Sequence, residues 1–94
     1  MKVLKLSTSW CPPCRALAPV FEKVSKSKEF NSIEFIALDV EQEQDNELVK
    51  KFQVRSVPTL YILDDNDEVI GTARGYHSEE QLKQFIKENI KTNE

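Results

Sequence analysis

The chain has 94 residues, which suits a single domain over residues 1–94 and leaves no room for a separate cofactor domain. Its 13 lysine and arginine residues and 16 acidic residues are scattered and give a net charge of −3. Without a basic block to hold phosphates, nucleic acid is not an expected partner. No apolar run approaches the roughly 20 residues of a membrane span, and the first six residues do not resemble a signal peptide. We therefore expect no membrane partner and a cytoplasmic location.

The spacing of apolar residues predicts a chain that alternates strands and helices. The first predicted helix begins at a cysteine pair, and the last begins at a capping box formed by Ser78 and Gln81. A polar, Asp-rich turn separates the last two strands, which predicts a hairpin. In chain order, the predicted elements are a strand over residues 3–6, a helix over 11–29, a strand over 33–40, a short helix capped by residue 45 or 46, strands over 59–63 and 68–74, and a helix from residue 78.

Three prolines lie in the first predicted helix. Pro12 and Pro13 suit its first turn, because the N–H groups there have no partner within the helix. Pro19 lies inside the helix and is expected to kink it.

The cysteine pair, Trp10-Cys11-Pro12-Pro13-Cys14, carries the chemistry. Two intervening residues allow a disulfide to close within one turn at the start of a helix. The unpaired N–H groups and the positive end of the helix dipole favour thiolate over thiol at Cys11. We expect Cys11 to be the more exposed cysteine, and Cys14 to be more buried and to keep its proton longer. The pattern predicts that Cys11 attacks a substrate disulfide and that Cys14 resolves the mixed disulfide.

Other uses of two cysteines remain as alternatives. A zinc site usually needs four ligands, and only His77 is available besides the cysteines. A metal site or an iron–sulfur cluster shared between two chains is a second alternative, and two inert, packed cysteines are a third. We expect no metal and no bound cofactor, because a Cys11–Cys14 disulfide is itself a redox centre.

Beyond the cysteine pair, the sequence resembles the thioredoxin family over nearly the whole chain. The matching segments are Trp10-Cys11-Pro12-Pro13-Cys14-Arg15, Ala18-Pro19, Leu38-Asp39-Val40, Val54-Arg55-Ser56-Val57-Pro58-Thr59-Leu60 and Gly75. The resemblance implies an α/β thioredoxin fold, with a four-stranded mixed sheet of order 2-1-3-4 and three helices, lacking the usual first strand and helix. It also implies an electron carrier that reduces protein disulfides and is recycled by a thioredoxin-reductase-type partner.

The resemblance also assigns substrate-binding residues. Val57-Pro58-Thr59 resembles the family's cis-proline segment, which lies against the cysteine pair, and the Val57 backbone would pair with an extended substrate. Trp10 and the loop around Gly75 border the groove in the family, although ordinary packing and a simple turn are alternatives. The implied substrate-binding set is Trp10, Pro12, Pro13, Val57, Pro58 and Gly75.

Three positions depart from the family pattern. Lys5 stands where the family usually has a buried aspartate that accepts the proton of the second cysteine, and Ala37 stands where a lysine commonly faces it. A buried Lys5 would have a lowered pKa, and its neutral amine would take the proton of Cys14. We favour the alternative in which its ammonium reaches water. Pro12 replaces the usual glycine, which leaves the redox potential open in size and direction.

Three functions therefore remain. A protein-disulfide reductase is favoured over the reverse chemistry of an oxidant or isomerase, and over a non-catalytic binding module. A glutaredoxin-like variant is disfavoured, because nothing after Pro58 resembles a site for the glutathione carboxylate. We expect a monomer that dimerises weakly through the uncovered, apolar edge strand 33–40.

Overall fold

The computed structural model describes residues 1–92, with side chains through residue 90. The elements follow in the predicted order. They are β1 (Lys2–Ser7), α1 (Pro12–Ser25), a 3₁₀ turn η1 (Lys28–Phe30), β2 (Glu34–Asp39), α2 (Glu47–Lys51), β3 (Thr59–Leu63), β4 (Val69–Arg74) and α3 (Glu79–Thr92). Within residues 1–92, no helix combines the length and the apolar character that a membrane crossing needs.

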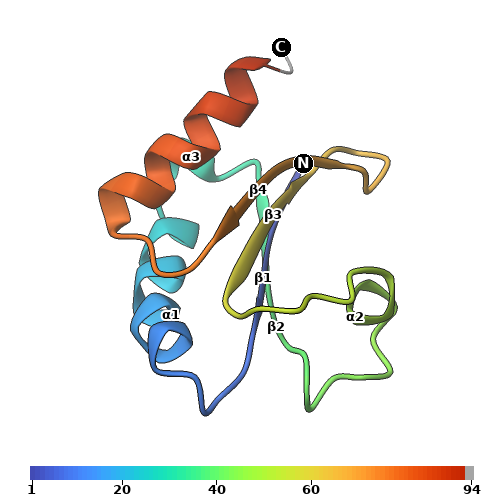
Figure 1. Ribbon diagram of the computed structural model, residues 1–94. Coiled ribbons are helices and arrows are strands. Elements are labelled where there is room, and N and C mark those ends of the chain that lie inside the picture. Colours follow the sequence, from blue (N-terminus) through green and yellow to red (C-terminus); the bar gives the residue numbers. More distant parts are fainter. Residues whose placement is uncertain (93–94) are drawn as a thin grey trace.

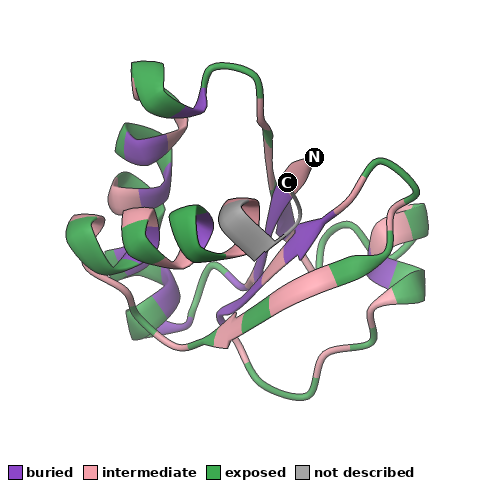
Figure 2. Ribbon diagram, turned by 90° about the horizontal axis from the view of Figure 1, so that it is seen from above, coloured by how far each residue is buried: buried purple, intermediate pink, exposed green. Residues whose placement is uncertain are grey.

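The four strands form one mixed sheet of order β2-β1-β3-β4, which confirms the predicted 2-1-3-4 order. The β1 strand pairs in parallel with β2 and antiparallel with β3, and β3 and β4 form an antiparallel hairpin. The α1 and α3 helices cover one face of the sheet and α2 covers the other (Figure 1). The central β1 strand is therefore covered on both faces, and its residues 3–6 are all buried (Figure 2).

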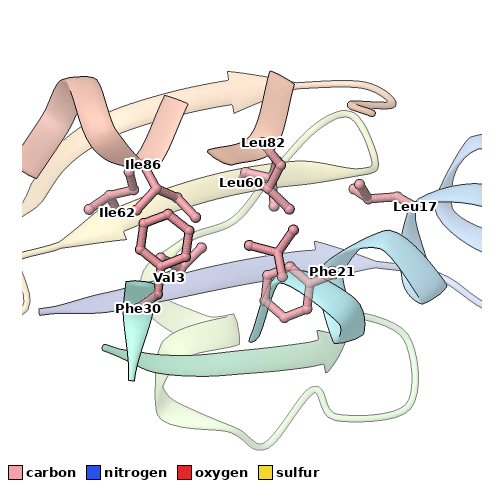
Figure 3. Close-up of a cluster of buried hydrophobic side chains, with 9 residues drawn as sticks. Val3, Leu17, Phe21, Phe30, Leu60, Ile62, Leu82 and Ile86 are labelled. Atoms are coloured by element: carbon pink, nitrogen blue, oxygen red, sulfur yellow. The ribbon is translucent and has the colours of Figure 1, made fainter. Parts of the chain in front are cut away.

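Two apolar clusters hold the layers together, and successive residues of β1 contribute to them in turn. Val3 joins the larger cluster, which fills the space between the sheet and helices α1 and α3 (Figure 3). Leu4 and Leu6 join a smaller cluster beneath α2. Because side chains alternate between the faces of a strand, Lys5 faces the same side as Val3, toward α1.

The first helix ends earlier than predicted. It runs without interruption through Pro19 but stops at Ser25, and Ser27 then has extended backbone angles. The η1 turn follows and places Phe30 in the larger cluster. Nothing in the local sequence marks this end, because the break is set by the need to bury Phe30 against the sheet. The kink at Pro19 stays a prediction.

The β2 strand lies at one edge of the sheet, as expected. Its apolar side chains are engaged with the core, since Phe35 packs on the larger cluster and Ile36 and Leu38 belong to the smaller one. Glu34 and Ala37 are exposed. What the edge offers to another strand is therefore mainly backbone N–H and C=O groups.

Candidate active site

The cysteine pair lies at the start of α1, at the end of the sheet where β1 finishes (lower edge of Figure 1). Cys11 is the N-cap residue, and Pro12 and Pro13 fill the first two helical positions. Neither proline has an N–H group, so the first free N–H of the helix belongs to Cys14. That N–H donates a hydrogen bond to Cys11 Sγ at 3.3 Å. The Cys11 sulfur thus lies at the positive end of the helix.

Both cysteines are free thiols and both are buried. Cys11 is 5% exposed and Cys14 is 2% exposed, so the expected contrast in exposure is small. Burial, followed by a hydrogen bond with Cys11, raises the pKa of the Cys14 thiol. The N–H and hydroxyl groups of Thr8 lower the pKa of Cys14 and so partly offset this rise.

The loop before β3 approaches the cysteine pair from the other side. The Val57–Pro58 peptide bond is cis. The Cys11 thiol donates to the Val57 carbonyl oxygen, with 3.7 Å between sulfur and oxygen. The Gly75 N–H, just after β4, donates to the Pro58 carbonyl oxygen at 2.9 Å. Three segments that are distant in sequence therefore meet at one end of the sheet.

Gly75 has a φ of 85°, which lies in the left-handed region. A side chain there would meet nothing within 4 Å, so the conformation and not the available space calls for glycine.

Trp10 is an exposed aromatic residue beside the cysteine pair. It is 62% exposed, so the alternative of ordinary core packing is wrong. Its indole Nε1–H donates to the Glu41 carboxylate at 2.7 Å. The sequence analysis missed Glu41, because it lies in a polar stretch 31 positions away. The contact holds the indole at the surface, next to Cys11.

Lys5 lies on β1 and interacts with Cys14 through its charge. It pairs across the sheet with Ala37 and Leu60. Only 6% of the residue is exposed, and Nζ lies 5.3 Å from the centre of the Phe21 ring. The Nζ atom itself is not fully enclosed, so the expectation that the ammonium reaches water stays a prediction. Burial lowers the pKa of Lys5, and the negative charge of an ionised Cys14 opposes this shift. The low exposure of Lys5 arises because Phe21 of α1 packs over this part of β1.

A surface hollow of about 350 Å³ lies beside this lysine, between α1 and β2. Lys5, Phe21 and Phe35 line it. Among the residues that the structure describes, none forms an ion pair with Lys5.

Thr8 is a second residue that the sequence analysis missed. Its place in the polar run after β1 is typical of a turn, and no local signal distinguishes it. In the structure Thr8 is 6% exposed, and its N–H and hydroxyl groups lower the pKa of the Cys14 thiol.

No group of three or more His, Cys, Asp or Glu residues within the described part of the chain could hold a metal ion. The described site consists of a dithiol at a helix N-terminus, flanked by backbone groups of two loops. Together with the sheet order, this arrangement defines a dithiol protein of the thioredoxin fold.

Comparisons with known proteins agree with this class. The family model described as Thioredoxin matches residues 1–88. The thioredoxin of Buchnera aphidicola subsp. Acyrthosiphon pisum is 40% identical over 81 residues, which cover 86% of this chain and 71% of that protein. The thioredoxin of Bacillus subtilis is 32% identical over 81 residues, which cover 86% of this chain and 74% of that protein.

Solved structures give the same result. The thioredoxin of Malassezia sympodialis superposes with a TM-score of 0.79 at 26% identity, covering 94% of this chain and 73% of that one. The thioredoxin of Fasciola hepatica gives a TM-score of 0.77 at 28% identity, covering 94% of this chain and 79% of that one. The chain belongs to the thioredoxin family. Membership supports a general role as a thiol–disulfide oxidoreductase.

Proposed function

We propose that this protein reduces disulfides in other proteins by dithiol–disulfide exchange, with Cys11 as nucleophile and Cys14 as resolving thiol. One observation carries the proposal. The Cys11 sulfur caps α1 and accepts the first free N–H of that helix, from Cys14, at 3.3 Å. A hydrogen bond to a sulfur at a helix N-terminus stabilises negative charge on it, and the thiolate is the attacking species.

The reaction transfers two electrons in two exchanges. The Cys11 thiolate forms a bond to one substrate sulfur, the substrate disulfide breaks, and the other substrate sulfur leaves as a thiolate that takes a proton from water. Cys14 then loses its proton to water and attacks Cys11 Sγ. A Cys11–Cys14 disulfide forms, the mixed disulfide breaks, and the second substrate sulfur leaves reduced.

The substrate would lie across the surface formed by the loops around the dithiol. The Val57 carbonyl accepts a hydrogen bond from the Cys11 thiol, and the Gly75 N–H donates one to the Pro58 carbonyl. The two loops therefore lie beside the reacting sulfur. An extended substrate segment would pair with the Val57 backbone in the manner of an added strand. Trp10 would contact the segment at one side, and the ring atoms of the two prolines between the cysteines would border the entrance.

No further cofactor enters this scheme, because the dithiol is the redox centre. Its disulfide form needs an external dithiol donor, and a reductase of thioredoxin-reductase type would return it to the reduced state. A reducing compartment such as the cytoplasm would suit this cycle.

Lys5 would take a different part from the carboxylate usual at this position. A buried ammonium cannot accept the Cys14 proton, but it attracts the Cys14 thiolate once that forms, and burial strengthens the attraction. The negative charge of Cys14 raises the Lys5 pKa against the lowering effect of burial, which supports an interaction between the two groups. We therefore assign Lys5 as a modulator of the Cys14 pKa.

The test is the reduction of a protein disulfide by dithiothreitol, with and without catalytic amounts of this protein. The wild type should accelerate the reaction, and Cys11→Ser should abolish the acceleration. Cys14→Ser should accumulate a mixed disulfide through Cys11, detected by mass spectrometry. A wild type that neither accelerates the reaction nor forms an internal disulfide would contradict the proposal. A Cys11→Ser protein that still binds reduced targets would indicate a binding module.

The direction of electron flow is measured separately, as the equilibrium potential of the Cys11–Cys14 pair in glutathione buffers, read by thiol alkylation. The cytosolic glutathione poise is about −220 to −260 mV by extraction. A reductase should lie well below that range. A value near or above it would favour an oxidant, an isomerase or a glutathione-coupled protein.

A further inference from the structure

The loop between β1 and α1 holds a buried hydroxyl group with no partner. Thr8 is 6% exposed, and its Oγ1 has no hydrogen-bond partner among the residues that the structure describes. A buried hydroxyl without a partner destabilises a fold and is rare in native proteins, so its presence calls for an explanation. A valine would fill nearly the same volume without a buried polar atom.

The hydroxyl of Thr8 is linked to the thiol of Cys14, which is also buried. Both the N–H and the hydroxyl of Thr8 act on the Cys14 pKa in the direction that favours the thiolate. A thiol sulfur is a weak acceptor, whereas a thiolate accepts strongly. The hydroxyl has no partner in the structure, where Cys14 is a free thiol, and an ionised Cys14 would offer it a strong acceptor.

The other groups that act on Cys14 do not provide such a donor. Cys11 raises the Cys14 pKa, and Lys5 is coupled to Cys14 through its charge. No carboxylate of the described residues is among the causes that act on either group. The resolving thiol thus meets hydrogen-bond donors and a cation rather than an anionic proton acceptor.

We propose that Thr8 is a further catalytic residue, whose hydroxyl donates a hydrogen bond to the Cys14 thiolate during resolution of the mixed disulfide. The inference rests on the proposed function, since it deepens the second exchange step. Thr8 keeps its own proton throughout. The Cys14 proton goes to water, the Cys14–Cys11 bond forms, and the electron pair of the broken mixed disulfide leaves with the substrate sulfur.

The test compares Thr8→Val, which removes the hydroxyl at nearly constant shape, with Thr8→Ser, which keeps it. Each reduced full-length protein is mixed in a stopped-flow instrument with a chromogenic aromatic disulfide. The first release of coloured thiolate reports attack by Cys11, and the second reports resolution by Cys14. We expect Thr8→Val to slow the second release about tenfold, which is about 1.4 kcal/mol, and to leave the first unchanged. Thr8→Ser should stay near the wild type.

Two further readouts separate a missing hydroxyl from a damaged fold. In a Cys11→Ser background, Thr8→Val should raise the Cys14 pKa, measured by thiolate ultraviolet absorbance, and Thr8→Ser should not. Thermal unfolding should show that reduced Thr8→Val is at least as stable as the wild type, because a partnerless polar atom has been removed. Thr8→Ala serves as a second hydroxyl-free variant if the valine protein fails to fold.

The outcomes that overturn the proposal are distinct. An unchanged second release in Thr8→Val overturns the role of Thr8 alone. Equal slowing in Thr8→Ser and Thr8→Val also overturns it, because side-chain shape and not the hydroxyl would then matter. A wild type that gives no second release overturns this inference together with the proposed function.

Discussion

Replacing Lys5 by methionine should make this protein more stable. Among the residues that the structure describes, Lys5 is the only charged residue that is buried. Methionine is unbranched, of similar length and able to fill irregular space. The Lys5 side chain lies against the Phe21 ring, and its ammonium has no ion-pair partner among the described residues. The substitution therefore removes a buried charge and keeps the packing.

The magnitude follows from two opposing contributions. Full burial of a polar group without a hydrogen bond costs about 1–3 kcal/mol in proteins, and the largely buried Lys5 ammonium is placed within that range. The contact between Nζ and the Phe21 ring, at 5.3 Å, offsets about 0.5–1 kcal/mol of this. We expect Lys5→Met to raise the free energy of unfolding by about 1 kcal/mol, which corresponds to about 4–8 °C in Tm for a domain of this size.

The gain should depend on pH in a direction set by the lowered Lys5 pKa. Between the folded-state pKa and the unfolded value of about 10.4, the unfolded wild type binds more protons than the folded one. Wild-type stability therefore rises with pH across that window, and the advantage of Lys5→Met shrinks. The raised Cys14 pKa has the opposite sign, because it lowers the stability of the reduced protein above about pH 8.5. Because Lys5 attracts the Cys14 thiolate, this loss should be larger in Lys5→Met than in the wild type, which also narrows the difference as pH rises.

The assay is urea unfolding of the reduced proteins at neutral pH and near pH 10, followed by circular dichroism. Lys50→Met is the matched control, because Lys50 is exposed on α2 and the same change there should stay within about 0.5 kcal/mol. The reasoning is refuted if Lys5→Met is less stable than the wild type at neutral pH. It is also refuted if the difference between the two proteins is the same at both pH values.

Three further predictions concern the site loop, the core and the sheet edge. Gly75→Ala should lower stability by about 1–2 kcal/mol in urea unfolding, because its φ of 85° is strained for alanine; an unchanged stability would show that the loop relaxes freely. Phe30→Ala should cost about 3–5 kcal/mol in the same assay, since η1 docks this ring into the larger cluster, and a loss below about 1 kcal/mol would mean that η1 contributes little to the core. Light scattering over a concentration series should detect weak self-association through the open edge of β2; a monomer at the highest attainable concentration would contradict it.

Local sequence signals predicted most of the fold. The apolar stretch of β1, the capping box of α3 and the Asp-rich turn before β4 act over a few residues, so each is visible without the rest of the chain. The sheet order came from the family resemblance. The end of α1 was not visible, because what stops that helix is the burial of Phe30 against a sheet that the local sequence does not contain.

The candidate site divides in the same way. The sequence by itself determined that Cys11 and Cys14 share the first turn of a helix, because a spacing of three residues and two prolines act within one turn. Only the tertiary structure decided that Cys11 faces the Val57 carbonyl, and that Lys5 and Thr8 are buried near Cys14. These relations depend on strand register and on how α1 packs over β1. Both result from burying apolar surface across the whole sheet, and no short segment of sequence carries that information.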